Sequence, residues 1–192
     1  MVTKEKQNEK LLKYSLLALL SAGFIYSLIL PFCWGNNPFD AMGTLSILCE
    51  NRKLWFWAWI IFDGGAMVVN LYYMYKKFGG ANKFIKALPV IAFIFGVGIA
   101  ATLGHDVMSW NPKRIVHWIA TGCYVAFLAA SIAIYAIKNF KKGRVFKAML
   151  ISVMSVLAVF LVWFIVLGKS AMLEAVPHAL LEILLVVFNF II

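Results

Sequence analysis

Three ionisable residues near the C-terminus follow one another at a spacing that places them on one face of a helix. Glu174, His178 and Glu182 are each four residues apart in an otherwise apolar stretch. Residues four apart are neighbours on a helix surface, so two carboxyl groups flank one imidazole. A carboxylate beside an imidazole orients it, exchanges a proton with it or shares a metal ion with it. The spacing therefore predicts a polar stripe suited to protons, metal ions or polar headgroups.

Four more ionisable residues stand in or beside apolar segments elsewhere in the chain. They are Asp63, His105, Asp106 and His117. Asp inside a membrane costs about 2.5–3.5 kcal/mol on insertion scales, so such residues normally face the bundle interior and have a partner. All three histidines of the chain fall toward the outer side of the apolar segments, whereas Asp63 and Glu182 fall deeper. The pattern predicts an outer polar vestibule with acidic groups beneath it.

Zinc is the first of several ligands that these residues suit. His105, His117 and His178 supply three imidazoles, with Asp106 or a glutamate as fourth ligand or base. The spacing lacks an HExxH motif, so it does not by itself identify a metal site. If the protein is an enzyme, we expect metal-assisted hydrolysis or transfer on a lipid amide or ester. The candidate proton acceptors for that reaction are Asp106, Glu174 and Glu182.

Three other interpretations of the same residues stay open. The histidines and acids would form a cradle for a lipid headgroup or another substrate that arrives from the outer leaflet. Alternatively, Asp63, Glu182 and the histidines would relay protons or ions across the membrane. In the last interpretation, pairs of histidine and acid only lock the helices together.

The elements that must position these residues are long apolar blocks. The 192-residue chain is 64% apolar and 14% charged, with a mean hydropathy of +0.89; soluble domains are about half apolar and about 25% charged. We predict an all-α integral membrane protein, because each block has roughly the 20 residues that cross a bilayer as a helix. The first block exceeds the 7–15 residues of a typical signal core, so we expect it to be retained. The six blocks form one domain over residues 1–192 and run approximately over 12–32, 54–75, 84–104, 115–137, 145–167 and 171–192.

The positive charges indicate how the blocks are oriented. The N-terminal segment, the second connection and the fourth connection carry 13 of the 18 Lys and Arg residues. Positive residues favour the cytoplasmic side, so both termini are predicted to be cytoplasmic, in a multi-pass protein of the cell membrane. The net charge of +10 is spread over loops that flank the blocks, which disfavours nucleic-acid binding. We expect membrane lipids as partners, and the apolar last block leaves a homo- or hetero-oligomer open.

Two cysteines and a cluster of tryptophans belong to the outer side of this arrangement. Cys33 and Cys49 lie in the first outer connection. A disulfide between them would close a loop of about 17 residues and contribute roughly 3 kcal/mol, and the alternative is two unpaired thiols. Trp55, Trp57 and Trp59 open the second block, as is typical of an interfacial aromatic belt.

Short motifs in the first outer connection and around the fourth block carry a family resemblance. They are Asn37-Pro38-Phe39-Asp40, Leu45-Ser46, the stretch 105–110, Pro112, and Ile115-Val116-His117-Trp118-Ile119-Ala120. The chain resembles the six-span family of GPI-lipid remodelling factors and damage-regulated autophagy modulators with their bacterial relatives. Glu174 and Glu182 are similar to acidic positions in the last helix of that family. The resemblance implies a protein that senses or acts on lipids, and we expect an outer cavity that binds or processes a lipid or lipid-like substrate.

Overall fold

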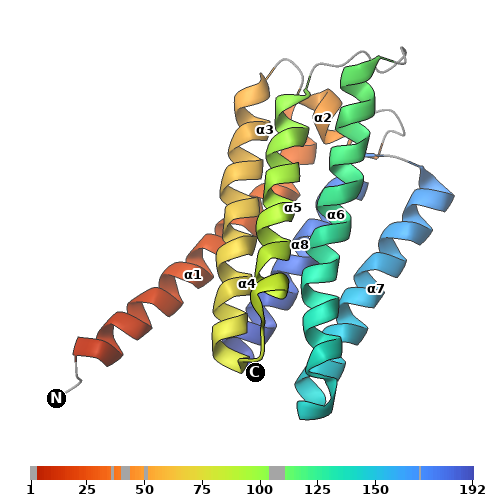
Figure 1. The fold of residues 1–192 in the computed structure, drawn as a ribbon. Helices are drawn as coiled ribbons and strands as arrows, with labels where there is room; N and C mark the ends of the chain where they lie inside the picture. Colours follow the sequence, from red (N-terminus) through yellow and green to blue (C-terminus); the bar gives the residue numbers. More distant parts are fainter. Residues whose placement is uncertain (1–3, 36, 40–43, 50–51, 104–110, 169) are drawn as a thin grey trace.

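The protein is helical throughout the part that the structure describes. The structure is a computed structural model that describes residues 4–35, 37–39, 44–49, 52–103, 111–168 and 170–192. Within these ranges all regular structure is helical, and six helices are long and apolar enough to cross a membrane, by length and composition. The predicted all-α class with six long apolar helices is confirmed (Figure 1).

Each predicted block corresponds to one long helix or to two or three joined helical segments. The first comprises α1 (Lys4–Ile29) and the 3-10 turn η1 (Leu30–Gly35), and the second comprises α3 (Lys53–Trp59), the π-turn η3 (Ile60–Gly64) and α4 (Gly65–Phe78). The others are α5 (Lys83–Ala101), α6 (Pro112–Lys138), α7 (Arg144–Leu167), and α8 (Ala171–Val186) with the π-turn η5 (Val187–Ile191). Two short elements complete the described chain: α2 (Leu45–Leu48) and the 3-10 turn η4 (Phe140–Lys142).

Local sequence signals fix where several of these helices begin and end. Asn82, Asn111 and Ser170 precede α5, α6 and α8, and the side chain of each accepts a hydrogen bond from a backbone N–H of the first turn. Such caps satisfy donors that have no partner within the helix. Gly79 and Gly168 follow α4 and α7 with φ of 67° and 73°, a left-handed conformation that glycine adopts without a Cβ clash.

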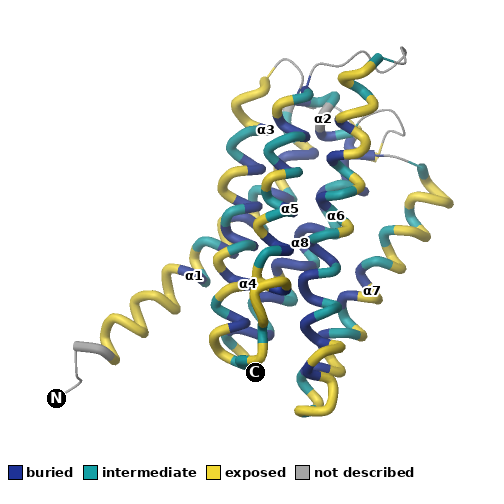
Figure 2. The backbone as a smooth tube through the Cα atoms, in the orientation of Figure 1, coloured by how far each residue is buried: buried dark blue, intermediate teal, exposed yellow. Residues whose placement is uncertain are grey.

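The last helix lies inside the bundle, whereas its predecessor lies at the edge. α8 packs against α1, α4 and α7, and α5 packs mainly against α6. Figure 2 shows buried residues along the facing sides of these helices, while most of the upper part of α7 is exposed. The first part of α1 projects away from the bundle, and residues 6–15 are exposed. The core of the bundle is therefore built around α8.

The two ends of the bundle differ in charge. The connections at 79–82 and 139–143 lie at the end where both chain termini are found (Figure 1). We call this the basic end, because lysines and one arginine gather in and around these connections. They include Lys76, Lys77, Lys83, Lys138, Lys141, Lys142 and Arg144. The opposite end, which carries α2 and the start of α3, is called the cavity end.

Candidate functional site: a cavity floored by an acid–histidine cluster

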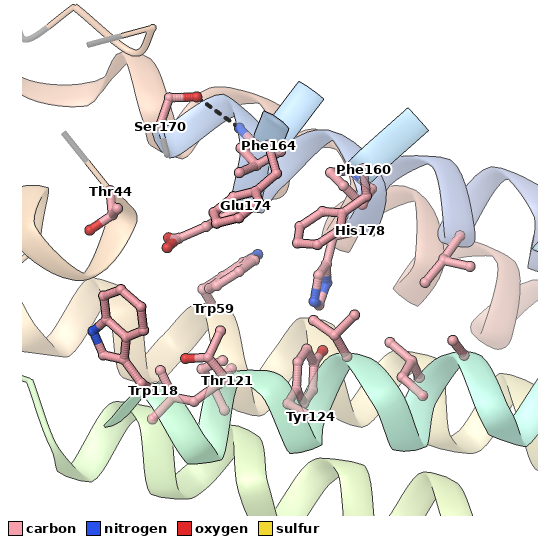
Figure 3. Close-up of a pocket in the computed structure, with 18 of the residues that line it drawn as sticks. Thr44, Trp59, Trp118, Thr121, Tyr124, Phe160, Phe164, Ser170, Glu174 and His178 are labelled. Carbon is pink, nitrogen blue, oxygen red and sulfur yellow. Dashed lines mark hydrogen bonds between the residues drawn. The ribbon is translucent and has the colours of Figure 1, made fainter. Parts of the chain in front are cut away.

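A cavity of about 630 Å³ opens between α6, α7 and α8 toward the cavity end. Its walls are mainly apolar and aromatic, with α7 supplying Val153, Val156, Leu157, Phe160 and Phe164. Ligand pockets typically have volumes of about 300–1,000 Å³ with apolar walls and a few converging polar groups. The polar side chains that line the cavity are Thr44, Arg114, His117, Thr121, Tyr124, Ser170, Glu174 and His178. Figure 3 labels all of them except Arg114 and His117.

The mouth of the cavity lies on the side of the bundle. Trp118 of α6 and Phe164 of α7 both line the cavity, yet their side chains are 45% and 42% exposed. Figure 3 shows them on separate helices that bound the same hollow. A residue that is both cavity-lining and exposed marks the edge of an opening, so the cavity is reached between α6 and α7.

His178 and Asp63 form the best-defined polar contact of the site. His178 Nδ1 lies 2.7 Å from Asp63 Oδ2, and both residues are buried. The distance is typical of a hydrogen bond in which a charged group takes part. Asp63 reaches this position from the π-turn η3, a local widening of the helix that recurs at functional sites. The imidazole is thus held at the cavity with a fixed orientation.

Two aromatic rings enclose the His178 imidazole. The ring of Tyr124 on α6 stacks on it with centroids 5.2 Å apart and an interplanar angle of 12°. The ring of Trp59 lies 4.9 Å away on α3, and Trp59 Nε1 donates to Ser27 Oγ at 2.8 Å. Figure 3 shows His178 reaching from α8 toward Tyr124. These contacts restrict the imidazole to one place while its Nε2 stays without a hydrogen-bond partner.

Glu182 lies beside Asp63, one turn further along α8 from His178. Its side chain has no exposed surface and interacts with the Asp63 carboxyl group. Gly23 of α1 faces both acids: a Cβ atom at Gly23 would overlap Glu182 Oε1 and would lie 2.8 Å from Asp63 Oδ1. Only a glycine therefore leaves room for both carboxyl groups where α1 crosses α8.

The rim of the cavity carries a second polar group of residues. Glu174 Oε2 accepts a hydrogen bond from the backbone N–H of Leu45 at 2.9 Å, which connects α8 to α2. His117 Nδ1 lies 3.0 Å from Thr102 Oγ1, which connects α6 to the end of α5. The Arg114 guanidinium lies 5.6 Å from the centroid of the Trp118 ring. The rim thus contains a carboxylate, an imidazole and a guanidinium.

The structure brings together five of the seven ionisable residues singled out in the sequence. Asp63, His178 and Glu182 form one cluster, and Glu174 and His117 line the same cavity nearer its rim. His105 and Asp106 lie outside the described residues. Within the described part of the chain, no group of three His, Cys, Asp or Glu residues is arranged to hold a metal ion. Zinc binding therefore stays a prediction that depends on those two residues.

The assignment of Trp59 to an aromatic belt is wrong. Its side chain is only 5% exposed, whereas that of Trp55, four residues earlier, is 51% exposed. Trp59 immediately precedes the π-turn η3 and packs on His178 inside the bundle, so it belongs to the site. The prediction failed because position at the start of an apolar block does not tell which face of the helix a ring occupies.

Other residues of the site were not singled out, although their spacing could have indicated them. Tyr124 follows His117 by seven residues, and Asn70 follows Asp63 by seven. Seven residues are two helical turns, so each pair shares a face. Asn189 likewise follows Glu182 by seven and is buried. Gly23 offered no such signal, because it stands in an ordinary apolar stretch of α1.

The cysteines of the first connection are free thiols in the structure, and the disulfide between Cys33 and Cys49 is not formed. Cys33 Sγ lies 3.6 Å from the backbone oxygen of Ile29. Cys49 is fully buried, and burial, reinforced by the nearby Glu174 carboxylate, raises the pKa of its thiol to about 12. A thiol reacts as its thiolate, so Cys49 is chemically inert near neutral pH.

No protein-family model, curated protein or solved structure matches this chain significantly. The resemblance of its short motifs to the lipid-remodelling family therefore stays a prediction.

Proposed function

We propose that the chain is a multi-pass membrane protein whose lateral cavity binds a lipid or a lipid-like amphiphile. The observation that carries this proposal is the position of the cavity mouth between Trp118 and Phe164, on an apolar side of the bundle. An amphiphile in the surrounding bilayer would reach the cavity sideways without crossing water. Its apolar part would contact the walls, and its headgroup would contact the rim.

The exposed face of α7 supports a membrane around this mouth. Large apolar side chains cover it without any ionisable group beyond Lys147. They include Ile151, Val159, Leu161, Val162, Ile165, Val166 and Leu167. Soluble monomers rarely expose contiguous apolar patches of this kind. Bilayer hydrocarbon covers such a face at no cost. We expect the basic end and both termini to be cytoplasmic in a cell-membrane protein, because positive residues favour that side.

The rim supports a polar or zwitterionic headgroup. Glu174 and Arg114 carry opposite charges, and His117 adds a group that can donate or accept a hydrogen bond. Charged groups at one end of an apolar hollow fit a molecule with one polar end.

Native mass spectrometry of the gently extracted protein tests lipid binding. We expect a lipid adduct on the wild type and its loss in Leu157→Trp, because the larger side chain fills the cavity from α7. Val162→Trp is the matched control, since Val162 lies on the exposed face of the same helix and does not line the cavity. Size-exclusion chromatography checks that both variants are folded. An adduct that survives Leu157→Trp, or no adduct on any variant, would contradict the proposal.

A further inference from the structure

Buried polar residues continue beyond the cavity along the contact between α4 and α8. On η3 and α4, Asp63 and Asn70 are seven residues apart. On α8 and η5, Glu182 and Asn189 are also seven residues apart. Both asparagines are at most 1% exposed. We call this line of residues the polar seam; it begins at His178 and runs toward the basic end.

Direct contacts connect the two helices at the far part of the seam. Asn189 Nδ2 donates to the backbone oxygen of Asn70 at 3.0 Å, and Asn70 Nδ2 donates to the backbone oxygen of Ala66 at 2.9 Å. Lys77, seven residues after Asn70, donates to the backbone oxygens of Phe188 and Asn189 at 3.1 and 2.9 Å. Polar groups thus follow one another from the cavity to a lysine at the basic end.

The seam also holds the buried polar atoms that lack partners. Among the described residues, such side-chain atoms occur on five residues, all of them in the seam or on the ring stacked upon His178. They are Asp63 Oδ1, His178 Nε2, Glu182 Oε1 and Oε2, Asn189 Oδ1 and Tyr124 Oη. An unpaired polar group in an apolar interior costs several kcal/mol, so native structures satisfy such groups with water, protons or ligands. Because these atoms lie along one line, the seam is suited to a mobile partner such as water or a proton.

A proton is the partner that the chemistry of the seam favours. Carboxylates accept hydrogen bonds and donate none, so the facing oxygens of Asp63 and Glu182 repel one another unless a proton lies between them. The groups that face this pair are few. Gly23 of α1 carries no titratable group, α6 contributes Tyr124, and α8 contributes His178.

The more distant charges border the two openings of the seam. Glu174 lies at the cavity rim, while Lys77 and Lys13 lie near the basic end, where the Lys13 ammonium is 5.9 Å from the Phe190 ring centroid. No cation of these described elements reaches the two carboxyl groups; His178 is their basic neighbour. The pair therefore depends on His178 and on a shared proton for neutralisation.

We propose that the seam is a proton relay that connects the cavity to the basic end of the bundle. His178, which lines the cavity, takes up a proton at its unpartnered Nε2 and releases the Nδ1 proton to Asp63 Oδ2. The N–H bond breaks as the O–H bond forms, which leaves a neutral imidazole with its proton on Nε2; a change back to the Nδ1–H tautomer precedes the next transfer. Asp63 passes the proton to Glu182 as Glu182 releases the proton that the pair shared. Asn70 and Asn189 hold water molecules that carry it further, because two helical turns, about 10 Å, separate Glu182 from Asn189.

This inference uses the cavity only as the access route, so it can fail independently of lipid binding. Proton flux is measured in phosphatidylcholine liposomes that contain the protein and a pH-sensitive dye, with a potassium gradient and valinomycin as the driving force. We expect flux above that of protein-free liposomes for the wild type. Glu182→Gln and Asn189→Leu should reduce it to the protein-free rate, and Glu182→Asp should restore part of it.

Two controls separate the relay from a folding defect. Glu9→Gln removes a carboxylate from the exposed part of α1 and should leave the flux unchanged. Infrared difference spectroscopy should show a protonated carboxyl band in the wild type that Glu182→Gln removes. Wild-type flux equal to that of empty liposomes, or unchanged flux in Glu182→Gln, would overturn the relay. A lipid adduct that persists in Glu182→Gln would then leave the binding proposal intact.

Discussion

The last two long helices are both apolar enough to cross a membrane, yet they occupy opposite environments. After Lys147, α7 has no ionisable residue, and most of its far half is exposed. α8 carries Glu174, His178 and Glu182, and it is buried among α1, α4 and α7. The more apolar helix is thus the outer one. In a bilayer the surroundings are as apolar as any core, so polar residues identify the buried helix.

Because α7 is apolar and α8 carries ionisable residues, the two helices contribute different parts of the site. α7 supplies apolar wall and one edge of the mouth, whereas α8 supplies Glu174 at the rim and two members of the cluster at the floor, His178 and Glu182. Small and polar residues on α1 and α4 allow these two helices to approach α8 closely. The closest approach is at Gly23 of α1, which lies beside Glu182. Substitutions on α8 and its partners should therefore cost far more stability than matched substitutions on α7.

Removal of the Asp63 carboxylate should give the largest loss. Asp63→Ala leaves His178 and Glu182 without their buried partner, and breaking a buried pair costs about 3–5 kcal/mol in the free energy of unfolding. Val162→Ala on the exposed face of α7 should change it by less than about 0.5 kcal/mol. Unfolding in mixed detergent micelles, followed by circular dichroism, measures both. Similar losses for the two variants would remove the distinction between the helices.

A smaller loss should come from the glycine that faces the cluster. Gly23→Ala forces the carboxyl groups of Asp63 and Glu182 to move, and overpacking of this kind costs about 1–3 kcal/mol. Gly122→Ala is the matched control, because no atom lies within 4 Å of a Cβ built at Gly122. Alanine is the better helix former, so the control should be neutral or slightly stabilising. The same unfolding assay measures both variants. Equal free energies of unfolding for the two would mean that α1 is not closely packed against the cluster.

The sequence predicted the long helices, because apolar length is a local pattern. Apolar length defined the helices, and the four-residue spacing placed His178 and Glu182 on one face of α8. The pairing of His178 with Asp63 across 115 residues could not be read from either segment alone. The π-turn η3 also changes the helix face on which Asp63 lies relative to Trp59. An apolar sequence such as Ile60-Ile61-Phe62 does not predict a π-turn.

Crosslinking with a lipid that carries a photoreactive group in its acyl chain tests the central claim most directly. The protein is irradiated in bilayers that contain this lipid, and modified residues are mapped by peptide mass spectrometry. We expect adducts on cavity residues such as Phe160 and Val125, in addition to the exposed face of α7 at Ile151 and Ile165. Adducts confined to the exposed face, with the cavity walls unmodified, would contradict a lipid-binding cavity.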